Sequence, residues 1–539
     1  MSTPATELFV DGVAVEAAGV PRGRAMLQRA AWAAKAFGGY DAATVARIVE
    51  AAARAGAQAA PELAREAVAE TGFGVVEHKL LKNLACSTGL LREYQGQDFV
   101  SPQVDAARKL VHVPRPAGVV LALTPSTNPV ATVFFTVILA LMTRNTVVIC
   151  PHPLAKGVCS RAASIMADAA VAAGAPDGCI QWVEEPSIPL LDALMSDERT
   201  DLVLATGGTA VVRAAYRSGN PALGVGPGNA PVLVDATADL ARAARCIVES
   251  KSFDHSVLCT NESVLIVEEA AARQLLRHLS REGAHLLGPD ECDRLRAQLF
   301  PAGRFDPSFV GQDAATIAGR IGVRIPPGTR VLLAPFELAV PEEVLAHEKL
   351  CPVLGLVTAA TAARGIDVAR AVLRISGAGH SAAIHSTDPR TIMEFGAAVQ
   401  VLRVSVNVGA SLGGAGVETN LALSMTIGTG FFGRSSLGSN LEPRHLVNHT
   451  TLAWNADAGV PMPAAVQGIQ VWTPPPATVP TYPLASNDPA SSPALQASSD
   501  AIPVPDPASA STPISPDAAA LREEIRRLIV EELRQIIRG

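Results

Sequence analysis

The 539-residue chain has no surplus of positive charge and few aromatic side chains. It carries 44 lysines and arginines against 51 aspartates and glutamates, for a net charge of −7, and aromatic residues make up 4%. A chain with this balance has no basic field that would attract nucleic acid or an anionic lipid surface. We therefore expect neither nucleic acid nor a membrane as a partner.

A long hydrophobic run is also missing. The longest apolar stretch, residues 130–142, has about 13 residues, whereas a helix that spans a bilayer needs about 20. Residues 1–20 contain three acidic residues and no basic segment followed by an apolar one, so no signal peptide is visible. We expect residues 130–142 to form a buried helix and the protein to be cytoplasmic.

The cysteines lack the pairing that a metal site or a disulfide framework needs. Eight are scattered along the chain, and no two form a CxxC pair. This spacing argues against a zinc knuckle and against a disulfide-stabilised secreted fold. We expect a reducing compartment and no bound metal.

What the sequence does contain is an alternation of strand-like and helix-like segments. Residues 21–94 have apolar residues at helical spacing. Short β-rich runs then alternate with helical stretches, which is typical of right-handed βαβ units and a mostly parallel sheet. The fold class is therefore predicted to be α/β. The β-rich runs lie at residues 118–123, 145–150, 201–206, 230–235, 262–267, 331–334, 355–357 and 381–385.

Composition divides the chain into four parts. A first α/β domain is expected at residues 1–234 and a second at residues 235–426. Residues 461–516 contain 14 prolines in 56 residues and no lysine or arginine, a composition typical of an extended linker that cannot form a core. Residues 517–539 are highly charged and have helical periodicity.

The residues that carry chemistry are a cysteine and a set of glycine-rich turns. Cys259 follows an apolar pair within residues 251–261, which is a weak signal alone because most buried cysteines are core residues. Thr206, Gly207 and Gly208 lie between a predicted strand and a predicted helix, where backbone N–H groups and the helix dipole bind nucleotide phosphates. No strict GxGxxG fingerprint follows this strand, so the turn alone indicates nucleotide binding only weakly.

Eight motifs in the chain resemble those of one known family. They occur in the family's order over roughly residues 25–455, and they identify the chain as similar to the CoA-acylating aldehyde dehydrogenases. The resemblance is to the aldehyde dehydrogenase half of bifunctional aldehyde–alcohol dehydrogenases and to single-domain relatives such as sulfoacetaldehyde dehydrogenase, without the iron-dependent alcohol dehydrogenase half. The motifs lie at residues 70–83, 124–129, 143–145, 151–156, 226–232, 251–259, 347–354 and 377–381.

The resemblance assigns the catalytic roles. Cys259 matches the family nucleophile, whose thiolate attacks the aldehyde carbonyl to form a thiohemiacetal. Asn128 matches the oxyanion donor, whose side-chain amide acts together with the backbone N–H of the cysteine. Losing one such donor typically costs about 10²–10³ in rate. Hydride then passes to the nicotinamide, which leaves an acyl thioester on Cys259.

The resemblance also implies that the first domain binds NAD and that residues 427–460 complete it. The same residues 427–460 include the oligomerisation region of a dimer or tetramer. Residues 235–426 are implied to form the catalytic domain. No arginine that would bind a 2′-phosphate is evident near Lys156, so NAD is expected rather than NADP. The roles of His255, where many relatives have Asn, and of His380 stay open. The implied cofactor contacts are His152 and Lys156 at the adenosine ribose, Thr206, Gly207 and Gly208 near the pyrophosphate and nicotinamide, Gly226 in the glycine-rich turn, and Glu348 at the nicotinamide ribose.

The fate of the thioester separates two enzymatic interpretations. Hydrolytic aldehyde dehydrogenases use a glutamate as general base for water, and the aligned position in this chain is Val225. Valine cannot activate water, so the thioester waits for the coenzyme A thiol. The expected reaction is aldehyde + NAD⁺ + CoA → acyl-CoA + NADH, with acetaldehyde, sulfoacetaldehyde or another short-chain aldehyde. Hydrolysis to the free acid is the alternative, and an inactive scaffold is a third interpretation, against which Cys259 and Asn128 argue.

The C-terminal segment indicates a further partner. Apolar residues from Leu521 to Ile537 form one stripe on the predicted helix at residues 517–539, and such a face needs a partner. The helix after a Pro/Ala/Ser-rich linker resembles the encapsulation peptides of bacterial microcompartment cargo, which implies a shell protein as partner. Self-association as a coiled coil and docking on the parent domain are the alternatives, and membrane-surface binding is disfavoured because the charges are balanced.

Overall fold

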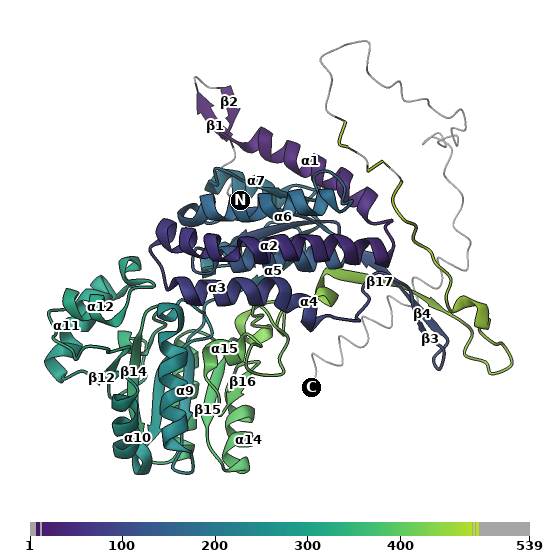
Figure 1. The fold of residues 1–539 in the computed structure, drawn as a ribbon. Coiled ribbons are helices and arrows are strands. Elements are labelled where there is room, and N and C mark those ends of the chain that lie inside the picture. The colour runs from purple at the N-terminus through teal and green to yellow at the C-terminus, as the bar shows by residue number, and fades with distance from the viewer. Residues whose placement is uncertain (1–6, 11–12, 477, 480, 484–539) are drawn as a thin grey trace, which may run out of the picture. The chain divides into compact units, whose positions relative to one another are not determined.

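Buried strands that alternate with helices form two parallel sheets, and hydrophobic cores cover both of them (Figure 1). The computed structural model describes residues 7–10, 13–476, 478–479 and 481–483. We call the five-stranded sheet with its helices the first lobe and the seven-stranded sheet with its helices the second lobe. The predicted α/β fold class is confirmed.

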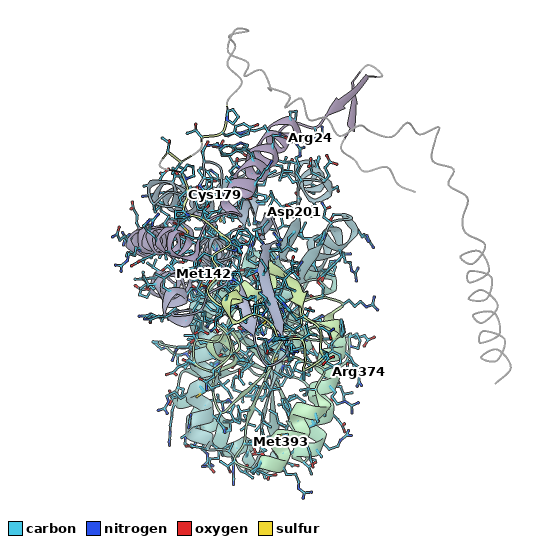
Figure 2. The ribbon with its side chains drawn as sticks, turned by 90° about the vertical axis from the view of Figure 1, so that its right-hand side faces the viewer. Arg24, Met142, Cys179, Asp201, Arg374 and Met393 are labelled. Carbon is cyan, nitrogen blue, oxygen red and sulfur yellow. The ribbon has the colours of Figure 1, made fainter. Side chains whose placement is uncertain are left out.

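The sheet of the first lobe has the strand order β7-β6-β5-β8-β9, and all its pairs are parallel. Its strands are β5 (Val119–Thr124), β6 (Thr146–Pro151), β7 (Ile180–Trp182), β8 (Leu202–Thr206) and β9 (Ala222–Val225). β5 and β6 are buried along their whole length, as expected when helices cover both faces of a parallel sheet. Asp201, labelled in Figure 2, holds the start of β5 beside β8 because its carboxylate accepts the Val119 N–H at 2.7 Å.

Helices pack on both faces of this sheet. They are α1 (Val20–Phe37), α2 (Ala42–Thr71), α3 (Val76–Leu84), α4 (Leu90–Glu93), α5 (Pro129–Met142), α6 (Lys156–Ala172), α7 (Ile188–Ser196) and α8 (Thr209–Arg217). Side chains of β5 alternate between two cores: Val120 packs in the core of α2, α5 and α6, and Val119 packs in the core of α1 and α7. In α5 every residue from Pro129 to Leu141 is buried, which confirms the predicted buried helix.

The second lobe repeats this plan on a larger sheet. The strand order is β12-β13-β14-β11-β10-β15-β16, again parallel throughout. Leu233 and Val264 face one core, while Val232 and Leu265 face the other. The strands are β10 (Ala230–Val234), β11 (Glu262–Glu268), β12 (Ala284–Leu286), β13 (Val331–Pro335), β14 (Val353–Ala359), β15 (Ala382–His385) and β16 (Val404–Val406). The helices are α9 (Leu240–Ser252), α10 (Glu269–Arg281), α11 (Pro289–Leu299), α12 (Ala314–Arg320), α13 (Ala362–Ile375), α14 (Pro389–Ala398) and α15 (Ala410–Gly414).

The boundary between the lobes differs from the predicted one. The prediction assigned residues 1–234 to the first domain, but β10 is an inner strand of the seven-stranded sheet. The chain therefore enters the second lobe before Ala230, because a fully buried strand belongs with the sheet that covers it. After the second lobe the chain returns, and Leu437, Leu441 and Leu446 join the core of α5.

Two small antiparallel elements complete the described fold. β17 (Val447–Ala453) pairs with β4 (Leu110–Pro116), which also pairs with β3 (Gln103–Asp105). β1 (Glu7–Val10) and β2 (Val13–Glu16) form a hairpin. No helix within the described residues is long and apolar enough to span a bilayer.

The start of the predicted linker packs on the first lobe. The indole N–H of Trp472 donates to the Val100 carbonyl at 2.9 Å, and the Arg144 guanidinium lies 4.3 Å from the Trp472 ring centre. The Tyr482 ring contacts Trp32 edge-on. The segment from residue 461 to Tyr482 therefore belongs to the unit formed by the two lobes, whereas the prediction began the free linker at residue 461. Residues 484–516 and the predicted helix at 517–539 lie outside the described residues.

Candidate active site

One cavity brings together most of the predicted site residues. It has a volume of about 590 Å³, and its walls come from the carboxyl ends of β5, β6 and β8 and from loops next to β10 and β11. In a parallel α/β sheet this edge is where ligands bind. Its lining includes Asn128, His152, Thr206, Gly207, Gly208, Val225, Gly226, Cys259 and Glu348. Of the predicted site residues, only Lys156 is not part of this lining.

Cys259 lies in a loop with an unusual backbone between α9 and β11. Asp254, His255 and Ser256 have φ values of 50°, 49° and 68°, a left-handed conformation that costs energy for residues other than glycine. The Asp254 carboxylate accepts the Val75 N–H at 2.7 Å and fixes this turn against α3. Gly74 allows the approach, since a Cβ there would collide with the Asp254 carboxylate.

The surroundings of Cys259 keep its thiol protonated. Burial raises the pKa of Cys259 to about 12, and the negative charge of Glu348 acts in the same direction. The positive charges of Arg403 and Lys82 act against them. Because the thiolate is the nucleophilic form, ligand binding or proton transfer has to accompany activation of this thiol.

Asn128 ends the segment after β5 and precedes the first residue of α5. Its side-chain Nδ2 donates to the carbonyl of Val257 at 3.2 Å, two residues before Cys259. Its Oδ1 accepts a hydrogen bond from Lys82 Nζ at 2.5 Å. The amide nitrogen also donates to the Thr127 hydroxyl at 3.3 Å. One N–H donor of Asn128 therefore reaches the cysteine loop, while its oxygen lies on the side of α3.

Glu348 faces the same cavity beside the cysteine loop. Its Oε1 accepts the Gly228 N–H at 3.1 Å, and burial raises the pKa of Glu348 to about 7. Gly228 itself needs to be glycine, because a Cβ there would collide with the Cys259 carbonyl oxygen. A carboxyl group that titrates near neutrality can accept a hydrogen bond from a ligand hydroxyl or exchange a proton.

The helices α5, α6, α7 and α8 all begin at or near the cavity, and the N-termini of α6 and α8 differ in whether a side chain closes them. The first turn of α6 is closed because the Glu70 carboxylate accepts the N–H groups of Gly157 at 2.8 Å and Val158 at 2.7 Å. The N-terminus of α8 has Gly208 as its cap, with no side-chain acceptor and no atom close to its Cα on the Cβ side. An anionic phosphate therefore fits at α8, where free N–H groups and the helix dipole stabilise it.

Of the two residues expected at the adenosine ribose, His152 lines the cavity and Lys156 does not. His152 lines the cavity, and its Nδ1 accepts the Leu154 N–H at 3.2 Å. Lys156 pairs instead with Glu185, with 2.5 Å between Nζ and Oε2. Glu185 precedes Pro186, which lines the cavity. The carboxylate of Glu185, which the sequence did not indicate, therefore lies next to the part of the cavity lining that contains Pro186.

The histidines that the sequence left open also have defined places. His255 Nδ1 lies 3.0 Å from the Gly311 carbonyl oxygen, and His255 does not line the cavity. His380 is fully buried, and its Nδ1 bonds to the Ser381 hydroxyl at 3.0 Å. Burial and the charge of Arg403 lower the pKa of His380 to about 3, so its ring is neutral at physiological pH.

A group of charged residues behind Asn128 was not predicted. Lys79 and Lys82 of α3 both pair with the Asp254 carboxylate, and all three side chains are buried. The motif at residues 70–83 contained both lysines, but nothing in the sequence linked them to Asp254, which lies 172 residues after Lys82. Among the described residues, no group of His, Cys, Asp and Glu side chains is arranged to hold a metal ion.

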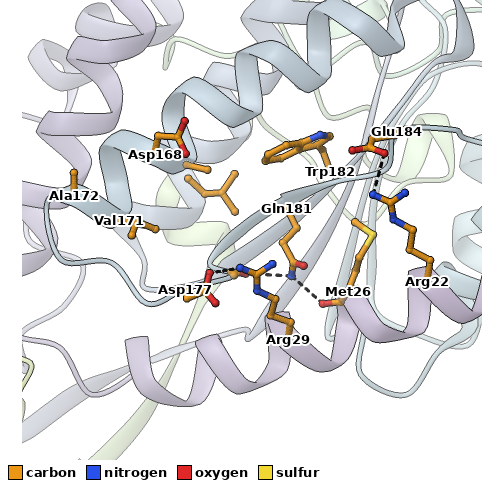
Figure 3. Close-up of a pocket in the computed structure, with 13 residues that line it drawn as sticks. Arg22, Met26, Arg29, Asp168, Val171, Ala172, Asp177, Gln181, Trp182 and Glu184 are labelled. Carbon is orange, nitrogen blue, oxygen red and sulfur yellow. Dashed lines mark hydrogen bonds and ion pairs between the residues drawn. The ribbon is translucent and has the colours of Figure 1, made fainter. Parts of the chain in front are cut away.

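A second cavity, of about 600 Å³, contains no nucleophile. It is lined by residues of α1, α6 and β7 (Figure 3). Arg22 pairs with Glu184 at 2.9 Å, Arg29 pairs with Asp177, and Gln181 donates to the Met26 carbonyl at 2.8 Å. Both arginines of the lining are paired with carboxylates and Asp168 adds a third acidic group, so this cavity offers a reacting ligand neither a thiol nor an unpaired cation among its lining residues.

Comparison with known proteins points to one family. The model of the aldehyde dehydrogenase family matches residues 4–293. The bifunctional aldehyde–alcohol dehydrogenase of Escherichia coli is 35% identical over 439 residues, covering 80% of this chain and 49% of the relative. The chain thus spans about half the length of such relatives. The acetylating succinate-semialdehyde dehydrogenase of Clostridium kluyveri is 34% identical, covering 81% of this chain and 96% of the relative.

Solved structures agree with these relatives. An acetylating aldehyde dehydrogenase from Geobacillus thermoglucosidasius has a TM-score of 0.80 and 34% identity, covering 83% of this chain and 98% of its own. A propionaldehyde dehydrogenase from a fucose-utilisation microcompartment of Clostridium phytofermentans has a TM-score of 0.73 and 27% identity, covering 80% and 97%. The Rhodopseudomonas palustris propionaldehyde dehydrogenase, solved with propionyl-CoA, has a TM-score of 0.73 and 27% identity, covering 80% and 94%.

Proposed function

Because the chain belongs to the aldehyde dehydrogenase family, we propose that it is a CoA-acylating aldehyde dehydrogenase that converts a short-chain aldehyde, NAD⁺ and CoA into acyl-CoA and NADH. Cys259, Asn128 and Glu348 are the residues of the cavity that carry the chemistry. The observation that supports this proposal most is their presence in one cavity with Val225 at the position of the hydrolytic base.

The chain's own residues account for the covalent steps. The Cys259 thiolate attacks the aldehyde carbon, and the carbonyl oxygen becomes an oxyanion that the Asn128 amide stabilises. When bound, NAD supplies the hydride acceptor that turns the thiohemiacetal into a thioester. Glu348, with a pKa raised to about 7 by burial, can take a proton from the cysteine or from the incoming thiol.

The residue at the position of the hydrolytic base favours acyl transfer to CoA over hydrolysis. Val225 is 2% exposed, lines the cavity and has no group that can activate water. With Val225 in place of the hydrolytic glutamate, the thioester survives until a thiol nucleophile arrives. The Rhodopseudomonas palustris enzyme has been solved with CoA and an acylated cysteine, which supports the same sequence of events in this chain.

The cofactor proposed is NAD. The open N-terminus of α8 fits its pyrophosphate, and the Glu348 carboxylate fits a ribose hydroxyl. Glu185 stands beside Lys156 at 2.5 Å, so the positive charge that would attract a 2′-phosphate is already neutralised. A carboxylate at this point repels NADP and accepts hydrogen bonds from the free ribose hydroxyls of NAD.

The aldehyde proposed is short and uncharged. No lysine or arginine lines the cavity within the described part of the chain, and most of its other lining groups are apolar or neutral. An anionic aldehyde such as succinate semialdehyde, the substrate in the name of the Clostridium kluyveri relative, would be buried there without a cationic partner. Such burial is costly, so acetaldehyde and propionaldehyde are the better substrates.

The tail and the assembly complete the proposal. The segment at residues 517–539, with its apolar stripe, binds a shell protein and carries the enzyme into a bacterial microcompartment. The relative from the Clostridium phytofermentans microcompartment supports this setting. The enzyme is a homo-oligomer, dimer or tetramer, as the family resemblance implies.

Intact-protein mass spectrometry tests the covalent mechanism. Enzyme incubated with propionaldehyde and NAD⁺ but no CoA is expected to gain one propionyl group, located on Cys259 by peptide mapping. Addition of CoA is expected to remove it and release propionyl-CoA. Enzyme that oxidises propionaldehyde without ever carrying an acyl group on Cys259 would contradict the proposal.

A further inference from the structure

The lysine cluster of α3 reaches the proposed oxyanion donor. Lys79 and Lys82 lie one turn apart on α3, and their side chains are 3% and 2% exposed. Lys79 Nζ lies 2.9 Å from Asp254 Oδ2, and Lys82 Nζ contacts the same oxygen. Two lysines at a single carboxylate are more than a structural ion pair needs, because one cation already neutralises Asp254.

The second lysine makes a contact that the first does not. Lys82 Nζ donates to Asn128 Oδ1, whereas Lys79 Nζ donates to the Thr127 backbone carbonyl at 2.6 Å. An ammonium group has donors and no acceptor. The Asn128 oxygen therefore has to face Lys82, because the reversed amide would place its NH₂ group against the NH₃⁺ group.

This contact determines where the Asn128 donors point. With Oδ1 held by Lys82, Nδ2 is directed to the cysteine loop and donates to the Val257 carbonyl at 3.2 Å. That distance is long for an N–H···O bond, so the donor can be given up to an oxyanion at small cost. A hydrogen bond from a cation also polarises the amide and strengthens its N–H groups as donors.

We propose that Lys82 is a positioning residue for aldehyde oxidation, which orients the Asn128 amide and polarises it toward the oxyanion formed at Cys259. Lys82 touches neither substrate nor cofactor in this role and acts through Asn128. The inference rests on the proposed roles of Cys259 and Asn128.

The charge states of His78 and Lys79, which lie next to Lys82 and Asp254, are consistent with a positioning role for Lys82 alone. His78 Nδ1 accepts the Asp254 N–H at 2.8 Å, and burial lowers the pKa of His78, so its ring adds no charge at neutral pH. Burial and the repulsion of Lys82 lower the pKa of Lys79 to about 7. Lys79 therefore loses its charge near neutrality, and its hydrogen bond goes to the Thr127 carbonyl and not to the Asn128 side chain.

A double-mutant cycle tests the inference through kcat of CoA-dependent NADH formation. Lys82→Met is expected to fold, because Lys79 still pairs with Asp254, and to lower kcat about 100-fold, the cost of losing an oxyanion donor. Asn128→Ala is expected to lose a similar factor. In the double variant the loss is expected to equal that of Asn128→Ala alone, with KM for aldehyde and for NAD⁺ within about threefold of the parent.

Lys79→Met is the matched control, because it removes a cation from the same carboxylate without a contact to the Asn128 side chain. It is expected to lower kcat less than about tenfold. Lys82→Arg, which keeps a cationic donor, is expected to recover at least about tenfold over Lys82→Met. If Lys82→Met has no cooperative melting transition, the cycle is run with Lys82→Gln, which stays polar at Asp254 but removes the cation, and is judged by the same criterion.

Three outcomes of the cycle and its control variant would overturn the inference about Lys82. Losses that multiply in the double variant, or a Lys79→Met variant as slow as Lys82→Met, would show that the lysines act as general structure and not through Asn128. Normal kcat in Asn128→Ala would remove the oxyanion role of Asn128 itself and the role of Lys82 with it. The first two results leave the proposed function standing, whereas the third contradicts its site assignment.

Discussion

At the scale of single residues, the raised pKa of the Cys259 thiol determines how the proposed reaction can begin. Burial and Glu348 raise the pKa of Cys259 to about 12, whereas Arg403 and Lys82 act in the opposite direction. The proposed nucleophile is therefore a neutral thiol in the free enzyme. Activation has to come with the substrates, whose binding changes the charges around the cysteine.

Alkylation of the free enzyme checks this state of the thiol. Because only the thiolate reacts with iodoacetamide and the pKa lies near 12, the rate at Cys259 is expected to rise about tenfold per pH unit from about pH 7 to about pH 10. Peptide mass spectrometry separates Cys259 from the other cysteines. A rate that levels off below about pH 8 would mean that the thiol is already activated without ligands.

Replacement of the nucleophile gives a second test. Cys259→Ala is expected to abolish NADH formation and acyl-enzyme formation, because the other cysteine of the cavity lining, Cys150, lies in β6 and outside the cysteine loop, and burial raises its pKa to about 12. Its melting temperature is expected to stay close to the parent value. Cys246→Ala is the matched control, since Cys246 is partly exposed on α9 and does not line the cavity. Substantial CoA-dependent activity in Cys259→Ala would refute the assignment of the nucleophile.

Val225 permits a gain-of-function test. Val225→Glu is expected to increase the fraction of product released as free acid, because a carboxylate next to the thioester can activate water. Val225→Gln has the same size without the base and is expected to keep the parent ratio of acid to acyl-CoA, measured by liquid chromatography. An unchanged ratio in Val225→Glu would count against the alignment of this position with the hydrolytic base.

At the scale of elements, helix ends decide where a dinucleotide fits. Glu70 closes the N-terminus of α6, and Gly208 leaves that of α8 open. The turn at Thr206, Gly207 and Gly208 was predicted from sequence because it joins a buried strand to a helix. The role of Glu70 could not be predicted, since its carboxylate comes from the end of α2, 87 residues before Gly157.

A carboxylate placed at the open helix end tests this assignment. Gly208→Asp is expected to raise KM for NAD⁺ about tenfold, because the new negative charge occupies the N–H groups and repels the pyrophosphate. Gly208→Ala is the control, since the Gly208 φ of −66° suits any residue and its Cβ meets no atom. An equal KM in the two variants would place the pyrophosphate elsewhere.

The elements also show what a sequence can and cannot predict. The buried strands β5, β6 and β15, and β11 with six of its seven residues buried, were predicted because β-rich runs between helices are distinctive. β7, β12 and β16 have three residues each, too few for a periodic signal. β10 was recognised as a strand but assigned to the wrong lobe, since parallel pairing with β11 and β15 depends on residues 32 to 151 positions away.

The candidate site was predictable only where residues share a short motif. Cys259, Asn128 and Glu348 each lie in a segment that resembles the family. The contacts of Lys82 with Asn128 and with Asp254 join residues 46 and 172 positions apart. Such contacts arise only when the first and second lobes are folded, so the sequence contained the residues of the cluster without indicating the cluster itself.

At the scale of the whole molecule, the proposed catalytic and targeting functions are assigned to separate parts of the chain. The cavity is built by the unit that ends at Tyr482, whereas the proposed shell-binding segment is residues 517–539. Trp472 attaches the beginning of the proline-rich segment to the first lobe through Val100 and Arg144. Loss of the last residues should therefore not disturb the active site.

Deletion of residues 517–539 tests this separation. Turnover of the purified enzyme is expected to change by less than about twofold, while the enzyme no longer copurifies with shells from cells that assemble them. The same segment fused to a fluorescent protein is expected to carry the reporter inside. A reporter that stays diffuse would contradict targeting, and a truncated enzyme that dissociates in size-exclusion chromatography would favour the coiled-coil alternative.

The CoA dependence of NADH formation tests the central proposal most directly. With aldehyde and NAD⁺ alone, absorbance at the NADH wavelength is expected to rise by at most one equivalent per active site and then stop, because Val225, at the position of the hydrolytic base, cannot activate water. Addition of CoA is expected to restart turnover and to give one acyl-CoA per NADH. Sustained NADH formation without CoA, accompanied by free acid, would contradict the account.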